Sequence, residues 1–351
     1  MRLYDAPILR RLRIELGSQC PVDVDVVNWV AKAIDCCVRN LKFKLRWKSE
    51  PIRMPQSLYT CKTLARLSLT DKILVDVPFP VSLPSLTRLD LRRVVYKDEE
   101  SHVRLLSGCP VLTHLTVVRH HDDDNVRKFS VKVPSLLNLR YTFFQVKEDD
   151  TPRSLVIDTP ALKYLDIIHI KGGSCSMEYM PHLVYAYICV RFYPDDNLLR
   201  SLSSIKYLQL HLPRTMVPWC GVNYSRLIEC RIRYYHPDEC ESLVLLLSNC
   251  PQLKVFTVES MIEIDRSRNH VPVPWNQPSS VPKCLSSHLK IFRWTGYAGR
   301  EDEKEFIRYI VEHSKCLVRA KVYLNLSCNP EEKQKMVEEL KSMPKVLTIV
   351  L

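Results

Sequence analysis

One short run of side chains has the chemistry to ligate a metal ion. His120 and His121 are followed directly by the aspartates at 122–124, and imidazole and carboxylate groups are common ligands of zinc and of harder cations. Adjacent residues cannot all converge on one ion, however, and the run lies just after an expected strand. We therefore predict a solvated loop here and no metal site.

Signatures of catalysis and of nucleotide binding are missing from the sequence. With only seven glycines, the chain has neither the loop G-x-G-x-x-G nor the phosphate-binding G-x-x-x-x-G-K-[ST]. It has no G-x-S-x-G nucleophile turn and no H-E-x-x-H zinc motif. We expect no catalytic residues and no cofactor, and a hydrolase is the least favoured of the alternatives.

The fourteen cysteines are another possible source of chemistry, but their spacing favours neither disulfides nor metal binding. They are scattered, they form no C-x-x-C pair, and several occupy hydrophobic positions of the repeat described below. Because a free cysteine packs as a small hydrophobic residue, we predict reduced, buried thiols in a cytoplasmic or nuclear protein.

Export and membrane insertion have no support in the sequence. Arg10, Arg11 and Arg13 stand where a secretory signal needs an uninterrupted apolar stretch. Nothing later in the chain approaches the roughly 18 apolar residues of a membrane span. We expect an intracellular protein that does not bind a membrane.

The net charge of +12 suggests an acidic partner, either nucleic acid or protein. The densest basic stretch covers residues 39–48, where Lys42, Lys44 and Arg46 alternate with Leu41, Phe43 and Leu45. This alternation is typical of a strand with one buried face. Its basic face could bind an acidic partner. The interpretation that we favour is a solvated face whose charges keep an early strand near the end of a sheet from pairing with other chains.

A repeat of the form apolar-x-x-apolar-x-apolar runs through most of the chain. From Val38 to Leu253 its first positions are 21 to 26 residues apart, inside the range of leucine-rich repeats, which is about 20 to 29 residues. The copies begin at Val38, Leu64, Leu86, Leu112, Leu136, Leu162, Leu183, Ile205, Leu227 and Leu253, with later versions at Leu289 and Leu317.

This spacing predicts an α/β fold, an irregular leucine-rich-repeat solenoid. Each copy forms a short strand whose apolar side chains point one way, and stacked copies cover one another in a curved parallel sheet. The asparagine that usually follows the strand is missing, so we expect the turns to be satisfied by other groups. Helices over residues 98–107 and 238–248 make two repeats βα units, and we expect only loops in the shorter ones.

The pattern lapses between Glu259 and Lys283 in a polar stretch rich in proline. Beyond it we predict a strand over residues 288–295, a helix over 302–313, a strand over 318–324 and a last helix. Asn329 can cap that helix, with Pro330 in its first position and Glu332 completing a capping box. The expected domains are a solenoid over residues 1–270 and a cap over 271–351 that closes its open edge.

Strand alternation identifies the side chains that leave the core and line the exposed face of the sheet. In the first half these are mostly basic and include Lys42, Lys44, Arg66, Arg88 and Arg92. Near the middle they are tyrosines flanked by arginines, namely Tyr164, Tyr185, Tyr187, Tyr207, Arg140, Arg231 and Arg233. Tyrosine and arginine carry most of the binding energy at protein interfaces. We predict a protein-binding surface here; the alternative is that the rings only pack on one another or lie under loops.

Several segments, in order, resemble plant F-box proteins that combine leucine-rich repeats with a carboxy-terminal FBD domain. They are Val26-Val-Asn-Trp-Val30, Leu58-Tyr-Thr-Cys-Lys-Thr-Leu64, Leu83-Pro-Ser-Leu86, Leu105-Leu-Ser-Gly-Cys-Pro110, Ser280-Val-Pro-Lys-Cys-Leu285 and Gly296-Tyr-Ala-Gly299. The resemblance covers nearly the whole chain. It implies a subunit of an SCF-type ubiquitin ligase that recognises the target protein with its repeats.

The F-box of this family, a helical module of roughly 45 residues, is not visible in the sequence. Residues 1–25 are too few for it, and Trp47 follows strand-like alternation. We expect either a member without an F-box, which holds a target without delivering it, or a chain that begins after a lost exon, so docking to the Skp-type adaptor does not follow. A less favoured alternative is a scaffold that binds nucleic acid or an acidic partner with its basic first half.

Overall fold

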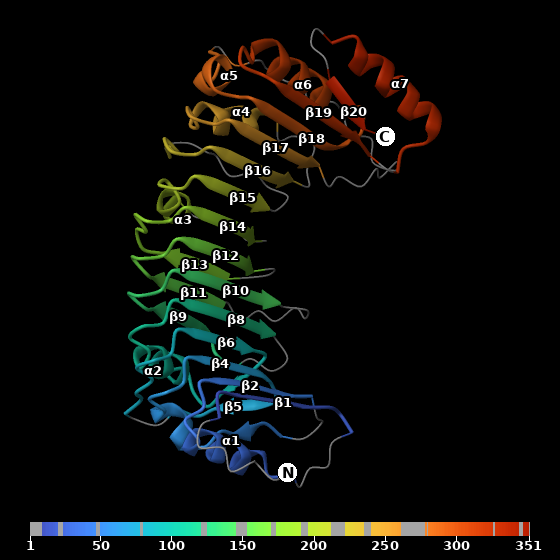
Figure 1. Ribbon diagram of the computed structural model, residues 1–351. Coiled ribbons are helices and arrows are strands. Elements are labelled where there is room, and N and C mark those ends of the chain that lie inside the picture. Colours follow the sequence, from blue (N-terminus) through green and yellow to red (C-terminus); the bar gives the residue numbers. More distant parts are fainter. Residues whose placement is uncertain are drawn as a thin grey trace. The chain divides into compact units, whose positions relative to one another are not determined.

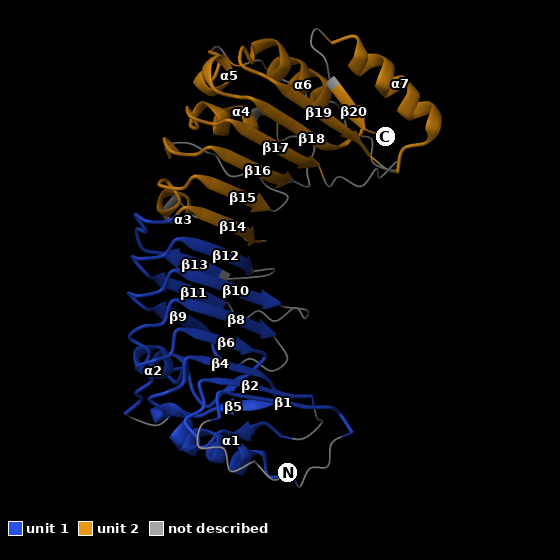
Figure 2. Ribbon diagram, viewed as in Figure 1, with its two compact units in different colours: residues 1–183 blue, residues 184–351 orange. Residues whose placement is uncertain are grey.

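The computed structural model describes residues 9–19, 24–46, 50–77, 80–120, 125–144, 153–169, 173–190, 196–211, 222–234, 240–260, 278, 280–325, 327–343 and 347–350. The chain divides into two compact units, residues 1–183 and 184–351 (Figure 2).

Unit 1 is built on a parallel sheet whose strands follow chain order (Figure 1). Each repeat supplies one strand, and its apolar positions, such as Leu67 and Leu69, are buried. The prediction of an α/β leucine-rich-repeat fold is therefore confirmed. The strands are β1 (Arg11–Leu16), β2 (Asn40–Leu45), β4 (Arg66–Asp71), β6 (Arg88–Arg92), β8 (His114–His120), β10 (Asn138–Phe144) and β12 (Tyr164–His169).

The amino-terminal part of unit 1 holds two elements that the repeat pattern did not predict. Strand β1 pairs in parallel with β2 and buries Leu12 and Ile14 between its arginines. Helix α1 (Val26–Asp35) begins where the Asp25 carboxylate accepts the backbone N–H of Asn28 at 3.0 Å. Both elements cover the first repeat. Because β1 pairs with β2, the strand of the first repeat is the second strand of the sheet.

Two small parallel sheets lie on the return segments of unit 1. One contains β3 (Ile52–Arg53), β5 (Ile73–Val75) and β7 (Val95–Tyr96); the other contains β9 (Lys128–Lys132), β11 (Arg153–Asp158) and β13 (Gly173–Met177). The 3₁₀ helix η1 (Gln56–Thr60) and helix α2 (Ser101–Ser107) complete these segments. The expectation of loops alone in the shorter repeats is wrong, because alternating apolar residues such as Phe129 and Val131 bury one face of each short strand.

Side-chain hydroxyl groups at the turn before the strand link three repeats to the repeats that precede them. The residue before the first apolar position of a repeat donates to a carbonyl of the preceding repeat: Thr63 to Val38 at 3.1 Å, Ser85 to Lys62 at 2.6 Å, and Ser135 to Leu112 at 2.9 Å. These bonds join each of the three repeats to its neighbour at the turn that leads into the strand.

Two buried arginines join the main sheet of unit 1 to the small sheet of β9 and β11. The guanidinium of Arg119 donates to the Tyr141 hydroxyl at 2.8 Å and to the carbonyl of Val126. That carbonyl also accepts from Arg153 at 2.8 Å. The Arg119 guanidinium lies 5.0 Å from the centre of the Phe129 ring. A cation–π contact therefore adds to the hydrogen bonds that hold this buried charge.

Unit 2 continues the same architecture with parallel strands in chain order (Figure 1). Its helices α4, α5 and α6 pack against one another on the return segments. The strands are β14 (Tyr185–Val190), β15 (Tyr207–His211), β16 (Glu229–Tyr234), β17 (Val255–Ser260), β18 (Ile291–Tyr297), β19 (Arg319–Leu324) and β20 (Leu347–Val350). The helices are α3 (Asp196–Ser201), α4 (Cys240–Ser248), α5 (Lys283–Ser287), α6 (Glu301–His313) and α7 (Pro330–Lys341).

The carboxy-terminal elements match the prediction closely. The expected strands and helices appear as β18, α6, β19 and α7, and the capping box of α7 forms, with the side chain of Asn329 accepting from Glu332 N at 2.8 Å. Strand β20 was not predicted. Strand β18 pairs with β17, so these elements extend the parallel sheet of the repeats. The domain boundary at residue 270 stays a prediction, and residues 261–277 lie outside the described residues.

Candidate protein-binding surface

Strand pairing arranges the outward side chains of unit 1 in rows across the sheet. The first row runs from Arg11 through Asn40, Arg66 and Arg88 to His114. The second row contains, in the same strand order, Arg13, Lys42, Ser68, Asp90 and Thr116. Side chains within a row therefore repeat at the strand spacing, which is about 4.8 Å.

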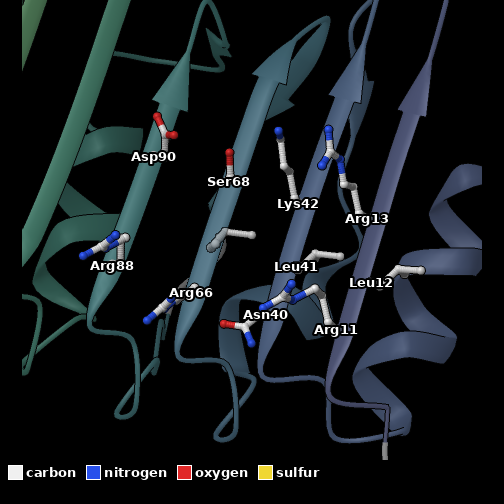
Figure 3. A pocket seen from close by; sticks show the side chains of 11 residues that line it. Arg11, Leu12, Arg13, Asn40, Leu41, Lys42, Arg66, Ser68, Arg88 and Asp90 are labelled. Atoms are coloured by element: carbon white, nitrogen blue, oxygen red, sulfur yellow. The ribbon is translucent and has the colours of Figure 1, made fainter.

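These rows border a hollow of about 310 Å³ (Figure 3). Figure 3 shows Arg11, Asn40, Arg66 and Arg88 along one level of four neighbouring strands, with Arg13, Lys42, Ser68 and Asp90 along the next. Leu12, Leu41 and Leu67, whose side chains belong to the core, also line it. Of the predicted basic patch, Lys42, Arg66 and Arg88 line the hollow, whereas Lys44 and Arg92 do not.

The charges around the hollow divide into paired and unpaired groups. Glu15 accepts from Arg13 Nε at 2.9 Å and lies 3.2 Å from Lys42 Nζ, and these two contacts, Lys42 first, hold the pKa of its carboxyl below the ordinary value. Asp90 accepts from Arg92 Nε at 2.8 Å. In contrast, Arg11, Arg66 and Arg88 make no ion pair with any residue that the structure describes.

The first row ends at His114, whose side chain is half-buried. Its Nδ1 lies 2.9 Å from Thr113 Oγ1, and its Nε2 lies 3.2 Å from Asn138 Nδ2. Burial, followed by the charges of Arg88 and Arg66, lowers the pKa of this imidazole. The arginines of this row lie on the first four strands of the sheet.

Two of the predicted protein-binding residues belong to unit 1. Tyr164 is 50% exposed at the start of β12. Arg140, on β10, donates through Nε to Asp166 at 2.7 Å, in the same row of outward side chains. The tyrosine is available to a partner, whereas the arginine already has a carboxylate beside it.

The remaining predicted residues belong to unit 2. Tyr185 and Tyr207 are register partners on adjacent strands, and Tyr207 is 40% exposed. Tyr187 is half-buried, because its ring meets His211 edge-on at 4.9 Å, with the hydroxyl oxygen 3.3 Å from His211 Nδ1. Burial and then the charge of Arg233 lower the pKa of His211 to about 4, so this imidazole is neutral at physiological pH.

Arg231 and Arg233 share one carboxylate. Arg233 donates through Nε to Glu259 Oε2 at 2.8 Å, and Arg231 Nε lies 3.6 Å from Glu259 Oε1. Sequence reasoning missed Glu259, although the regular repeat length places it beside Arg233 as the register partner on the next strand. Within each unit the structure thus brings the predicted side chains onto the outward face; their role in binding a protein stays a prediction.

The run of possible metal ligands that starts at His120 leads out of β8, and its residues 121–124 lie outside the described residues. In the part of the chain that is described, no cluster of histidine, cysteine, aspartate or glutamate is suited to hold a metal ion. None of the described helices is both long and apolar enough to cross a membrane.

Two family models match separate segments of the chain. A family model of the FBD domain matches residues 277–322. A second model, which describes the leucine-rich repeats of FBD-associated F-box protein At5g56370, matches residues 26–180.

Related proteins from Arabidopsis thaliana match over almost the whole chain. Putative F-box/FBD/LRR-repeat protein At3g49480 is 55% identical, and the match covers 100% of this chain and 81% of the relative. Putative FBD-associated F-box protein At1g05080 is 46% identical over 99% of this chain and 81% of its own length. Putative F-box/FBD/LRR-repeat protein At1g22000 is 45% identical over 99% of this chain and 76% of its own length. No solved structure matches the chain.

Proposed function

Because the chain belongs to the plant family of FBD-associated F-box proteins with leucine-rich repeats, we propose that it recognises the target protein of an SCF-type ubiquitin ligase. The target binds to the outward side chains of the parallel strands. The names of the relatives describe binding modules and repeats, in keeping with a role as a binding protein.

The observation that carries this proposal is the exposure of large aromatic side chains on strands of the sheet. Tyr164 and Tyr207 are 50% and 40% exposed, although the strands that hold them are otherwise well packed. A tyrosine fixed on a strand loses little conformational freedom when it is covered, so it can contribute more than about 1 kcal/mol to an interface.

Target capture can be tested with substitutions of the exposed tyrosines. The full chain is expressed in plant cells with Tyr164→Ala and Tyr207→Ala, and co-purified proteins are quantified by mass spectrometry against the unsubstituted chain. We expect the variant to lose the partners that the unsubstituted chain retains, with both chains equally folded by circular dichroism. Tyr187 is left unchanged in this test, because its removal would also remove the contact with His211.

The matched control is Tyr179→Ala. Tyr179 is 66% exposed but lies outside the strands. Its substitution therefore removes a similar exposed aromatic ring from a different place on the protein. Equal partner sets for the double variant and the unsubstituted chain would show that the outward tyrosines do not hold the target.

Participation in a ligase requires a second test, which is binding of the chain to a purified Skp-type adaptor. Binding supports a complete ligase subunit. Absence of binding, together with target capture that depends on Tyr164 and Tyr207, supports instead a protein that holds its target without delivering it for ubiquitination.

A further inference from the structure

The hollow between β1 and β6 is bordered by three arginines that have no acidic partner among the described residues. Arg11, Arg66 and Arg88 are exposed beside it, each on a different strand. They make no ion pair with any described residue, although other basic side chains of the same face are paired. Like charges placed this close repel one another, and an anion would remove that repulsion.

We propose that this hollow binds the phosphate group of a phosphorylated side chain on the target protein. The inference rests on the proposed function and deepens it, because it assigns a chemical group of the target to one place on the sheet. The arginine guanidinium is a planar fork whose N–H groups match the oxygens of a phosphate. Three such forks line one hollow, together with Asn40, which lies between Arg11 and Arg66 in the row.

The position of the leucines supports a bound side chain over a free ion. A volume of about 310 Å³ exceeds the needs of a phosphate alone, and Leu12, Leu41 and Leu67 line the hollow beneath the polar groups. The apolar lining suits the carbon atoms of a side chain and of the adjacent peptide.

The distribution of acidic groups favours a compact anion over a nucleic-acid strand. Asp90 lies in the row next to the arginines, Glu15 lies one row further along β1, and His114 ends the row of arginines. A nucleic-acid backbone needs a continuous basic track that follows successive phosphates. Here the arginines without an ion pair form one cluster, and the nearest other basic side chains, Arg13 and Lys42, already contact Glu15.

The probe for this site is a set of three peptide pools, random except for a central phosphoserine, serine or glutamate. Binding of each fluorescent pool to the full chain is measured by polarisation at physiological ionic strength. We expect the phosphoserine pool to bind about tenfold more tightly than either other pool, since a dianion takes up more of the arginine donors than a carboxylate does. Equal affinities for the three pools would overturn the proposal.

Substitution of the arginines locates the binding. Arg66→Gln with Arg88→Gln should weaken binding of the phosphoserine pool about 100-fold, the product of roughly tenfold for each lost charged hydrogen-bonding group. The matched control is Lys128→Gln with Lys132→Gln, which removes the same charge from exposed positions on the small sheet of the same unit. An equal loss in the control would show that net charge alone attracts the peptide.

Two further measurements complete the test. Arg66→Lys with Arg88→Lys preserves the charge but not the fork, and full affinity in this variant would contradict recognition by the guanidinium groups. A random single-stranded RNA or duplex DNA that binds more tightly than the phosphoserine pool, and displaces it, would assign the cluster to nucleic acid instead.

Failure of this inference and failure of the proposed function give different results. If the tyrosine variant loses target capture but the chain shows no preference for phosphoserine, the protein-binding surface is supported and phosphate binding in the hollow is rejected. If the chain prefers phosphoserine through Arg66 and Arg88 but the tyrosine substitutions do not change target capture, phosphate binding in the hollow is supported. Target binding by the exposed tyrosines is then rejected.

Discussion

Single residues in this protein hold their ionisation states through burial. His102 is enclosed in unit 1, where its ring stacks on Phe129 with centres 4.2 Å apart and its Nε2 accepts the backbone N–H of Ser130 at 2.9 Å. Burial and then the charge of Arg119 lower the pKa of this imidazole to about 4. The folded protein therefore keeps His102 neutral at pH values where an unfolded chain would protonate it.

The pH dependence of stability follows from this depressed pKa. The unfolded histidine titrates near its ordinary value of 6.5, so the neutral site contributes full stability above that pH. As the pH falls from about 6.5 to about 4, the unfolded state binds more protons, and roughly 3 kcal/mol of stability is lost. We expect His102→Gln to remove this part of the acid sensitivity, measured by urea unfolding across the range. His182→Gln, at an exposed histidine, should leave the profile unchanged, and an identical slope in the His102 variant would contradict the assignment.

The sequence was informative about which residues face outward but not about their partners. Alternation along a strand fixes the side of the sheet, so Arg66, Arg88, Tyr164 and Tyr207 were placed correctly from local pattern alone. Ion pairs such as Arg233 with Glu259 depend on the register between strands, which follows from the repeat length and not from the alternation along one strand. The hollow was missed because Arg11 lies on β1, and the arginines of that segment were interpreted only as evidence against a secretory signal.

Elements that carry strong local signals were predicted well. The repeat strands have their leucine triplets, and α7 has its asparagine, proline and glutamate in consecutive capping positions. The short strands β9 and β11 lack a leucine triplet, and they form because their few apolar residues are buried against the main sheet and around Arg119. Their stability comes from tertiary contacts, so a pattern based on the repeat could not reveal them.

The capping box of α7 gives a prediction at the scale of the element. Asn329→Ala removes the acceptor of the Glu332 N–H at 2.8 Å and should lower the free energy of unfolding by about 1 kcal/mol. Asn329→Asp is the matched control, since aspartate caps a helix about as well as asparagine does. Both changes are measured by chemical denaturation; equal destabilisation by alanine and aspartate would contradict a role in capping.

At the scale of the whole chain, the accessibility of the cysteine thiols reports how tightly the repeats are packed. Among the described cysteines, Cys37 and Cys316 are exposed, while Cys109 and Cys284 are buried free thiols. Burial raises the pKa of Cys109 and of Cys284 to about 12. The thiolate is the form of cysteine that reacts. Cys109 and Cys284 are therefore protected from modification both by burial, which blocks access, and by remaining protonated.

Brief alkylation of the native protein, followed by peptide mapping, tests this difference. We expect Cys37 and Cys316 to be modified early and Cys109 and Cys284 only after denaturation. A fully denatured sample provides the control in which all sites react. Early modification of Cys109 or Cys284 would show that the repeats open far more readily than their packing implies.

The alternation of buried and outward positions along each strand also bears on how such genes diverge. Leu67 and Leu69 hold the repeat together, whereas Arg66 and Ser68, directly beside them, contribute little to the interior. A point mutation at an outward position changes the chemistry offered to a partner at almost no cost in folding. Duplicated copies of this scaffold can therefore acquire new specificities one codon at a time while the fold is inherited intact.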